Sequence, residues 1–382
     1  MTLYIDISEF LKTRFCTGIQ RVIKEFLKRV ILEDFSVYIL SYDASNQKYL
    51  ALDISEVDDF LKDTQHYKFK KFKYIDIFQN SLEIKIFFEI DAVWNTNKKR
   101  KVLYKELKSH NFKIYNFIYD LIPINLPELL RENTKKNFPS FLQALYKYSD
   151  FIFFDSISAQ EDYKTLKNKL KIMRNIPTQV VNLGADFIQK PSKMDKNYSN
   201  LLSTKYILFV GTIEPRKQQA QLLKAFDVLH NEYPDLYLIF IGKIGWKVDS
   251  FINDLKNNPL KDKNIYHLTD IDDSLLSKFY QNAYIVTYLS IYEGYGLPIA
   301  ESLYHGNITI ASKNSSMIEV GEDFVDYIQN NTQKEIIDIL KKYLQNQYLY
   351  DQKRNYIKTH YKINSWNDFY NSIIKDISKE IK

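Results

Sequence analysis

The sequence predicts an α/β fold of two Rossmann-like domains, each a parallel sheet with helices on both faces. Apolar runs of strand length alternate with segments of helical periodicity along the chain. With 382 residues, 45% of them hydrophobic, the chain can bury two cores of ordinary domain size. Residues 187–204 are polar and lack clear periodicity, which indicates a domain boundary.

We therefore expect an N-terminal domain over residues 1–190, a C-terminal domain over residues 191–364 and a helix within residues 365–382. Two such domains facing each other across a cleft would turn both sets of strand ends towards one ligand.

The first elements are a short buried strand over residues 1–8, a polar loop over residues 12–18 and a helix over residues 19–30. Gly18 is the only glycine in the first 183 residues. A glycine that opens a helix after the first strand lets a ligand phosphate approach the backbone. A simple turn explains the same glycine equally well.

Residues 66–74, HYKFKKFKY, interleave lysine with aromatic side chains. Such a strand can rest on an anionic membrane, where each lysine gains on the order of 1 kcal/mol. An edge strand that lysines protect from aggregation has the same pattern. The sequence leaves both interpretations open.

A strand over residues 113–120 ends at Asp120. The carboxyl end of a parallel strand is where open α/β sheets bind ligands, so Asp120 is a candidate ligand-binding carboxylate. Alternatively, Asp120 orders the following loop through its own backbone. A helix over residues 138–148 and strands over residues 151–158 and 179–186 follow, and Ser156 is expected in a turn or as an N-cap.

The C-terminal domain repeats the alternation of strands and helices. Strands are expected over residues 206–210, 236–241, 265–267 and 283–289, and helices over residues 219–233, 248–257 and 274–282. The turn after the first strand carries Arg216 and Lys217. Two cations there can neutralise a diphosphate, arginine as a planar fork and lysine as a point charge. Taken alone, such a pair is also common at a solvated helix start.

The strand over residues 283–289 runs into a glycine turn, EGYG at residues 293–296, and then into a helix with Pro298 near its start. Glycines let the backbone approach a ligand closely. The N–H groups of the first helical turn favour a phosphate. This strand, turn and helix therefore predict an anion-binding site.

Two carboxylates belong to the same segment, Glu293 before the glycine turn and Glu301 inside the helix. Because carboxylates repel phosphate, both must face another part of the ligand. An ionised carboxylate only accepts hydrogen bonds, and a sugar diol offers two donors. The ligand that this segment predicts is a nucleotide sugar.

Composition excludes several other classes of protein. The net charge of +6 is small, and glutamates lie among the scattered lysines, so no nucleic-acid partner is expected. The single cysteine, Cys16, excludes an intrachain disulfide and favours a cytoplasmic setting. The N terminus lacks the apolar run of a signal peptide, and no run of eighteen apolar residues occurs. We therefore expect a soluble cytoplasmic protein.

Several stretches carry a resemblance to a known family. They are TGIQRV from Thr17, DAVW from Asp91, YDLIPINLPE from Tyr119, GTIEPRK from Gly211, GKIGW from Gly242 and YEGYGLPIAESLYHG from Tyr292. Together they resemble the retaining GT-B glycosyltransferases of family four, close to bacterial mannosyltransferases of surface-polysaccharide assembly. The similarity runs from about Thr2 to Trp366. It implies a GT-B fold with an N-terminal acceptor-side domain, a C-terminal nucleotide-sugar domain and a last helix that returns to the first domain.

The resemblance also implies an activity. A sugar would pass from a nucleoside-diphosphate sugar to a glycan or lipid-linked acceptor with retention of anomeric configuration, and GDP-mannose is the favoured donor. Separately from the resemblance, we expect no cofactor or metal requirement, and the membrane interpretation of residues 66–74 would place the protein peripherally at the inner face of the cell membrane. Asp270 and Asp272 match the D-x-D pattern by which other glycosyltransferases hold a cation, but they precede a helix and are expected to cap it.

Residue roles follow from the resemblance. Glu301 would bind the nucleotide ribose, Glu293 the donor sugar, and Arg216 with Lys217 the diphosphate. Gly18 would lie under the donor. The backbone amides expected on the sugar and phosphate are those of Gly294, Tyr295, Gly296 and Leu297.

The chain departs from the family at Tyr119, where many members carry histidine, so Asp120 becomes the candidate for contact with the transferred sugar. Two alternatives to a transferase remain: a nucleotide-sugar epimerase or hydrolase of the same fold, and a non-catalytic partner subunit. An inactive partner would be expected to lose the charged donor residues, and this chain retains them.

Overall fold

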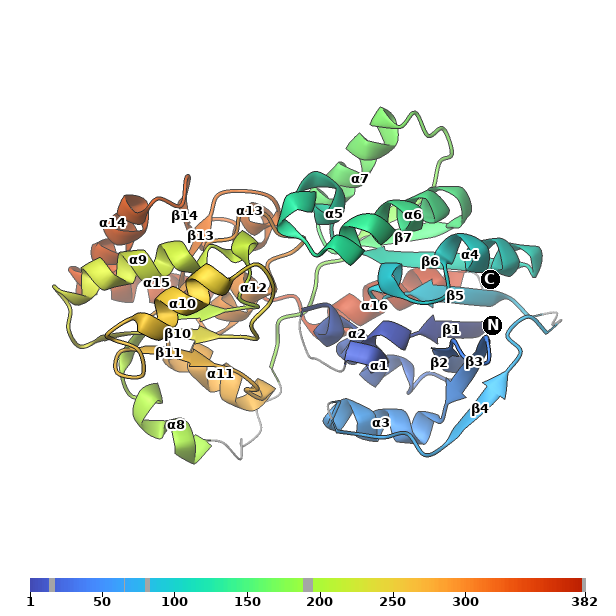
Figure 1. Ribbon diagram of the computed structural model, residues 1–382, viewed down its shortest axis with the longest axis horizontal. Coiled ribbons are helices and arrows are strands. Elements are labelled where there is room, and N and C mark those ends of the chain that lie inside the picture. Colours follow the sequence, from blue (N-terminus) through green and yellow to red (C-terminus); the bar gives the residue numbers. More distant parts are fainter. Residues whose placement is uncertain (14–17, 65, 80–82, 188–194, 380–382) are drawn as a thin grey trace. The chain divides into compact units, whose positions relative to one another are not determined.

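The computed structural model describes residues 1–13, 18–64, 66–79, 83–187 and 195–379. The chain divides into two compact units: unit 1 comprises Met1–Leu183 and Trp366–Lys382, and unit 2 comprises Gly184–Ser365. In each unit, helices cover a central sheet (Figure 1). The predicted boundary between residues 190 and 191 lies outside the described residues, as do Cys16 and Thr17.

Unit 1 contains an eight-stranded sheet with the order β4-β3-β2-β1-β5-β6-β7-β8. The strands are β1 (Thr2–Asp6), β2 (Ser36–Asp43), β3 (Lys48–Leu52), β4 (Phe72–Ile75), β5 (Lys85–Glu89), β6 (Phe112–Ile118), β7 (Phe151–Phe154) and β8 (Thr178–Val180). β3 pairs antiparallel with both β2 and β4, whereas the other pairs are parallel. The Rossmann-like sheet of unit 1 thus has an antiparallel edge, because the short connection between β2 and β3 cannot make a parallel crossover.

Helices and two 3-10 turns surround this sheet. They are α1 (Ser8–Thr13), α2 (Gly18–Val30), α3 (Ile54–Lys62), η1 (Val93–Asn95), α4 (Arg100–Ser109), α5 (Ile122–Asn125), η2 (Pro127–Leu129), α6 (Glu132–Tyr148), α7 (Ile157–Lys169) and α16 (Trp366–Ser378). α1 begins before the predicted polar loop and extends into it. The amides of Glu9 and Phe10 donate to Asp91 Oδ2 at 3.0 and 2.8 Å, so a residue distant in sequence caps this helix.

Several predicted elements of unit 1 are shorter than expected. The strand predicted over residues 151–158 ends at Phe154, because Ser156 caps α7 by accepting from the amide of Ala159 at 3.0 Å. The strand predicted over residues 179–186 is reduced to β8. β4 is the outermost strand of the sheet, so the edge-strand interpretation holds for residues 72–74, whereas residues 66–71 are not in a strand.

The last helix completes the core of unit 1. The ring of Tyr370 in α16 lies 5.3 Å from that of Phe26 in α2, and its hydroxyl donates to Glu33 at 2.6 Å. Phe369 packs against Phe117 of β6 at 5.8 Å between ring centroids. The chain therefore contributes to unit 1 from both of its ends.

Unit 2 is a six-stranded sheet with the order β11-β10-β9-β12-β13-β14, and all its pairs are parallel. Its strands are β9 (Lys205–Val210), β10 (Leu236–Ile241), β11 (Ile265–Leu268), β12 (Ile285–Tyr288), β13 (Ile308–Ser312) and β14 (Asp326–Ile328). Its helical elements are α8 (Asp195–Leu202), η3 (Pro215–Lys217), α9 (Gln219–His230), α10 (Asp249–Asn257), α11 (Asp273–Asn282), α12 (Leu297–Tyr304), α13 (Ser316–Gly321), α14 (Gln333–Leu344) and α15 (Gln347–His360).

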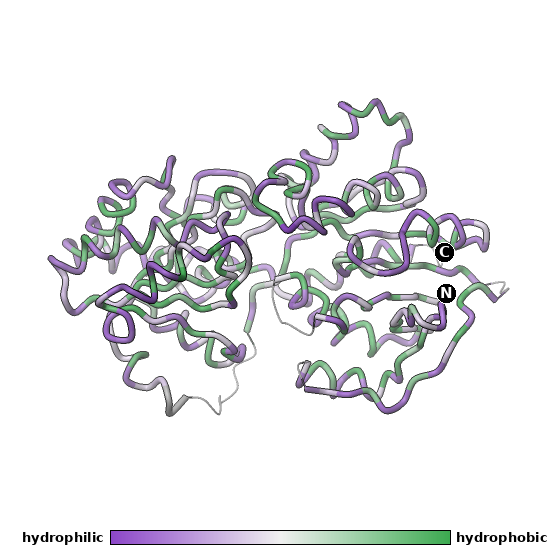
Figure 2. Tube along the Cα trace, in the orientation of Figure 1, coloured by the Kyte–Doolittle hydropathy of each residue, from purple (hydrophilic) through white to green (hydrophobic). Residues whose placement is uncertain are grey.

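The central strands of both sheets are hydrophobic on both faces, since helices cover both. β9 is buried from Tyr206 onward, and β12 is buried along its whole length. Figure 2 shows the same pattern, with hydrophobic colour along the inner strands and hydrophilic colour on the outer helices. Among the described residues, no helix is long and apolar enough to cross a membrane.

Candidate active site

Two glycine-containing loops meet at the carboxyl ends of β9 and β10. Gly211 and Gly242 have φ values of +148° and +153°. A Cβ on Gly242 would lie 2.1 Å from the carbonyl oxygen of Gly211, so only glycine lets the two backbones approach this closely. A bridge between Ile213 and Ile244 continues the contact. The motifs GTIEPRK and GKIGW therefore form one unit of structure.

Arg216, in η3 after β9, is held by two carboxylates. Its Nη2 lies 2.6 Å from Glu214 Oε1, its Nη1 lies 2.7 Å from Glu293 Oε1, and Nη1 also donates to the carbonyl oxygen of Tyr292. Burial acts to lower the pKa of Arg216, but Glu293 and Glu214 outweigh it and raise that pKa above its ordinary value. The guanidinium is therefore a fixed positive charge.

Lys217 contacts the same carboxylate. Its Nζ donates to Glu293 Oε1 at 2.7 Å and to the hydroxyl of Tyr288 in β12. Burial raises the pKa of Glu293, but Arg216 and Lys217 outweigh it and hold that pKa at about 2, below its ordinary 4.5. Arg216, Lys217, Glu214 and Glu293 form a buried cluster, which we call the charge cluster.

The loop that carries Glu293 is fixed by its backbone. The amide of Glu293 donates to Ser315 Oγ at 3.0 Å, and its carbonyl accepts from Ser316 Oγ at 3.0 Å. The amide of Ile291 donates to the carbonyl of Arg216 at 2.8 Å. Gly296, with φ of +102°, directly precedes α12. The charge cluster therefore lies on the loop that enters the N terminus of α12, where backbone amides favour an anion.

Glu301 lies farther along α12 and is 2% exposed. Its Oε2 accepts from the hydroxyl of Tyr280 in α11 at 2.8 Å. His305 lies against the carbonyl of Glu301 at 2.8 Å from Nδ1, and its Nε2 lies 2.8 Å from Ser277 Oγ. Residues of α11 thus fix both the side chain and the helical turn of Glu301.

The structure brings Arg216, Lys217 and Glu293 into direct contact, and residues 294–297 continue from Glu293 into α12. Glu301 shares this helix but has a different hydrogen-bond partner. The pairing of Glu293 with both cations goes beyond the sequence analysis, which assigned this carboxylate to the sugar.

The two candidate site residues in unit 1, Asp120 and Gly18, belong to a different unit from the charge cluster. Asp120 Oδ1 accepts from the amide of Ile122 at 2.9 Å, which is the loop-ordering contact that the alternative interpretation predicts. Tyr119 is buried, and its hydroxyl donates to the carbonyl of Ile90 at 2.7 Å. Gly18 begins α2, and a Cβ at this position would meet no atom within 4 Å. Sterics within the described residues do not require glycine there.

Three residues of the site were not predicted: Glu214, Tyr288 and Tyr280. Glu214 could have been predicted from the sequence, because it lies two residues before Arg216 in the motif GTIEPRK. Both tyrosines are strand or helix residues whose periodicity indicates only the core, so their sequence positions carry no comparable signal. Asp272 Oδ1 accepts from the amide of Leu275 at 2.8 Å, which confirms the prediction that the D-x-D segment caps a helix.

Comparison with known proteins identifies relatives of this chain. Residues 193–362 match the family Glycosyl transferases group 1. The serotype-specific mannosyltransferase WbdA of Escherichia coli is 31% identical over 246 residues, which cover 62% of this chain and 30% of that protein. The O-antigen chain mannosyltransferase B of Escherichia coli is 36% identical over 119 residues, 31% of each chain. This chain therefore spans about 30% of the length of these relatives.

A solved structure extends the likeness to the whole chain. Anabaena Alr3699/HepE in complex with UDP and glucose aligns with a TM-score of 0.67 at 13% identity, covering 99% of this chain and 100% of that one. The fold and the charge cluster define a GT-B protein of two α/β units. More particularly, residues 193–362 match the glycosyl transferases group 1 family, and the relatives matched at 30% identity or more are named as mannosyltransferases.

Proposed function

We propose that the chain is a retaining glycosyltransferase of bacterial surface-polysaccharide biosynthesis. It would transfer mannose from GDP-mannose to a glycan or lipid-linked glycan acceptor. The observation that carries this proposal is the buried Arg216–Lys217 pair, held by Glu293 on the loop that enters α12. An arginine and a lysine beside helical amides suit a diphosphate. Relatives named as mannosyltransferases support the sugar, and the neighbour solved with UDP and glucose supports a nucleotide-sugar partner.

In the reaction, the bond between the anomeric carbon and the diphosphate oxygen breaks, and the nucleoside diphosphate leaves with the bonding electrons. An acceptor hydroxyl oxygen forms the new bond on the same face, and its proton passes to the leaving diphosphate or to solvent. Arg216 and Lys217 would stabilise the negative charge that develops on the diphosphate. Such stabilisation of developing charge is usually the largest single contribution to catalysis. Retention rests on the family resemblance.

Donor binding has to rearrange the charge cluster, because Glu293 and a diphosphate compete for the same two cations. We propose that Glu293 then accepts hydrogen bonds from the donor sugar, while Glu214 keeps Arg216 in place. Glu301 would accept from the ribose diol. The site needs no metal in this scheme, and the reaction would take place in the cytoplasm.

The first experiment is a thermal-shift screen against GDP-, UDP-, dTDP- and CMP-sugars. A donor at about 100 times its dissociation constant should add about 2.7 kcal/mol of stability. A shift with GDP-mannose that Lys217→Ala removes would support the site. Lys341→Ala is the control, because Lys341 is a partly exposed lysine of the same unit that pairs with Glu232 at 2.5 Å.

The second experiment measures transfer to an acceptor extract that contains lipid-linked glycans. Lys217→Ala and Glu301→Ala should each lower transfer at least about tenfold, which corresponds to about 1.4 kcal/mol in the transition state. Wild-type rates in both variants would contradict the assignment. Release of free sugar without acceptor would favour a hydrolase, and absence of any donor shift in folded protein would favour a non-catalytic subunit.

A further inference from the structure

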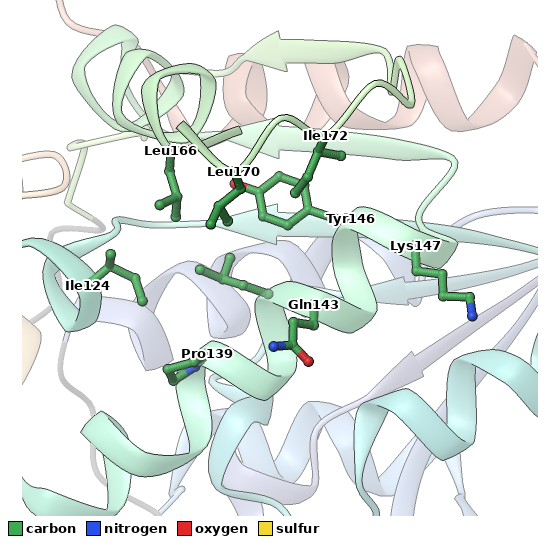
Figure 3. A pocket seen from close by; sticks show the side chains of 9 residues that line it. Ile124, Pro139, Gln143, Tyr146, Lys147, Leu166, Leu170 and Ile172 are labelled. Atoms are coloured by element: carbon green, nitrogen blue, oxygen red, sulfur yellow. The ribbon is translucent and has the colours of Figure 1, made fainter. Parts of the chain in front are cut away.

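An apolar groove lies between α6 and α7 in unit 1. Its volume is about 490 Å³, within the range of ligand pockets. Figure 3 shows side chains from the two helices facing each other across it. The lining residues are Ile124, Pro139, Leu142, Gln143, Tyr146, Lys147, Leu166, Leu170 and Ile172.

The groove is fixed by contacts at its base. The rings of Tyr146 and Tyr163 stack at 5.2 Å between centroids. Arg174, in the segment after α7, donates from Nη1 to the carbonyl of Tyr146 at 3.3 Å. This hydrogen bond connects that segment to α6. A ligand would therefore find the groove already formed.

The segment after α7, which lines the groove with Leu170 and Ile172, exposes large apolar side chains. Met173 is 91% exposed and Leu170 is 55% exposed. α7 itself buries only Ala159 and Tyr163. Exposed apolar groups beside an apolar groove are typical of an interaction surface.

The same region of the chain is strongly basic. Residues 163–175, YKTLKNKLKIMRN, contain four lysines and one arginine and no carboxylate. Lys164 pairs with Glu161, and Arg174 lies 3.8 Å from Asp150. Lys167, Lys169 and Lys171 have no ion pair within the parts of the chain that the structure describes. Three cations close in sequence to the exposed Leu170 and Met173 are complementary to an anionic surface with an apolar interior.

We propose that the α6–α7 groove and the segment Lys167–Arg174 dock on an anionic phospholipid bilayer. Leu170 and Met173 enter below the headgroups, the lysines contact lipid phosphates, and a hydrocarbon chain lies in the groove. The charge complementarity selects this occupant, because a neutral partner would leave the unpaired lysines without counter-charges.

The groove is a better membrane site than the lysine-rich residues 66–74, which lead into β4. The hydroxyl of Tyr74 in β4 donates to Asp43 at 2.8 Å, and the amides of Lys70 and Lys71 donate to Glu56 at 2.9 Å. These carboxylates lie among the lysines of residues 66–74 and reduce attraction to anionic lipid. Residues 66–74 thus provide a matched control surface in the same unit.

The test is flotation of the full chain with vesicles of phosphatidylcholine alone or with phosphatidylglycerol. Replacing Lys167, Lys169 and Lys171 with Gln should weaken binding to the anionic vesicles at least about tenfold. Replacing Lys70, Lys71 and Lys73 with Gln removes the same charge from the lysine-rich residues 66–74 and should leave binding within about twofold. Thermal midpoints of both triple variants should match the wild type, because all six side chains are on the surface.

A second measurement locates the apolar contact. Tryptophan at Met173→Trp should be quenched by lipids with brominated acyl chains, whereas tryptophan at Phe72→Trp in β4 should not. Equal binding by the two triple variants, loss only in the triple variant of residues 66–74, or no flotation of the wild type would overturn the proposal. Flotation only when the vesicles contain a polyprenyl phosphate would also overturn it, in favour of a lipid-linked acceptor in the groove. None of these outcomes depends on the transferase activity.

Discussion

Replacing Glu293 with Gln should destabilise unit 2 by about 3 kcal/mol. Glu293 Oε1 accepts from Arg216 Nη1 and Lys217 Nζ, both at 2.7 Å, and its side chain is 9% exposed. Without this charge, Glu214 is the only carboxylate left in the charge cluster to balance the two buried cations. The cluster then carries one uncompensated buried positive charge.

Two estimates give the magnitude. Removing one partner of a buried ion pair costs about 3–5 kcal/mol, and Gln retains an acceptor oxygen, which favours the lower end. Independently, the lowering of the Glu293 pKa from 4.5 to about 2 in the folded protein corresponds to about 3 kcal/mol of stabilisation of the ionised form. In a unit of this size, such a loss lowers the thermal midpoint by about 6–12 °C.

The assay is hydrogen exchange of amides in β9 and β12, which reports the opening of unit 2 itself. Glu232→Gln is the matched control, because Glu232 is 48% exposed and pairs with Lys341 at the surface. The control should change the opening free energy by less than about 1 kcal/mol.

The pH dependence follows from the direction of the shift. The folded-state pKa of Glu293 lies below the unfolded value, so its contribution is present above about pH 4.5 and is lost as the pH falls towards 2. The difference in thermal midpoint between wild type and Glu293→Gln should therefore fall by roughly half between pH 7 and pH 3. An effect no larger than that of Glu232→Gln, or one equal at pH 7 and pH 3, would refute the reasoning.

Three further perturbations test single contacts, and a fourth tests the chemistry. Tyr280→Phe removes the 2.8 Å donor to Glu301 and should raise the KM for the donor about fivefold in steady-state kinetics, with kcat little changed. Gly296→Ala should lower the free energy of unfolding in urea by about 1–2 kcal/mol, because φ at this residue is +102°. Sterics add little, since the nearest atom to the new Cβ would be at 3.5 Å. The control, Gly18→Ala, should not change the free energy of unfolding measurably. Tyr119→Phe should lower stability by about 1–2 kcal/mol by leaving the Ile90 carbonyl without its donor, and a transfer assay should give the wild-type rate. Transfer should also continue unchanged in EDTA, and loss of activity restored by manganese would contradict the metal-free scheme.

The strands of unit 2 were the most predictable elements. β9 and β10 are apolar runs between turns, and their observed bounds agree with the prediction within one residue. Apart from the last helix, α16, the elements after Gly306 were not predicted. β14, for example, has three residues, 326–328, and is defined by its pairing with β13. Such a strand has too few residues for a periodic signal.

Unit 1 was less predictable because distant residues decide its local structure. α1 begins where Asp91 caps it, although eighty-two residues separate Asp91 from Glu9. The antiparallel edge formed by β3 and β4 depends on short connections within a region that has both strand and loop character. A local sequence pattern does not indicate a capping residue that is so distant in the sequence.

The types of residue at the site were predictable, but their pairing was not. From the sequence, we assigned the two cations to the diphosphate and the two carboxylates, Glu293 and Glu301, to sugar hydroxyls. In the folded unit, Arg216 and Lys217 are already balanced by Glu214 and Glu293, so the charge cluster is formally neutral before any donor binds. A neutral cluster alone does not attract a diphosphate. In the proposed reaction, the amides at the N terminus of α12 therefore have to supply the attraction, and the release of Glu293 to the sugar has to free the cations.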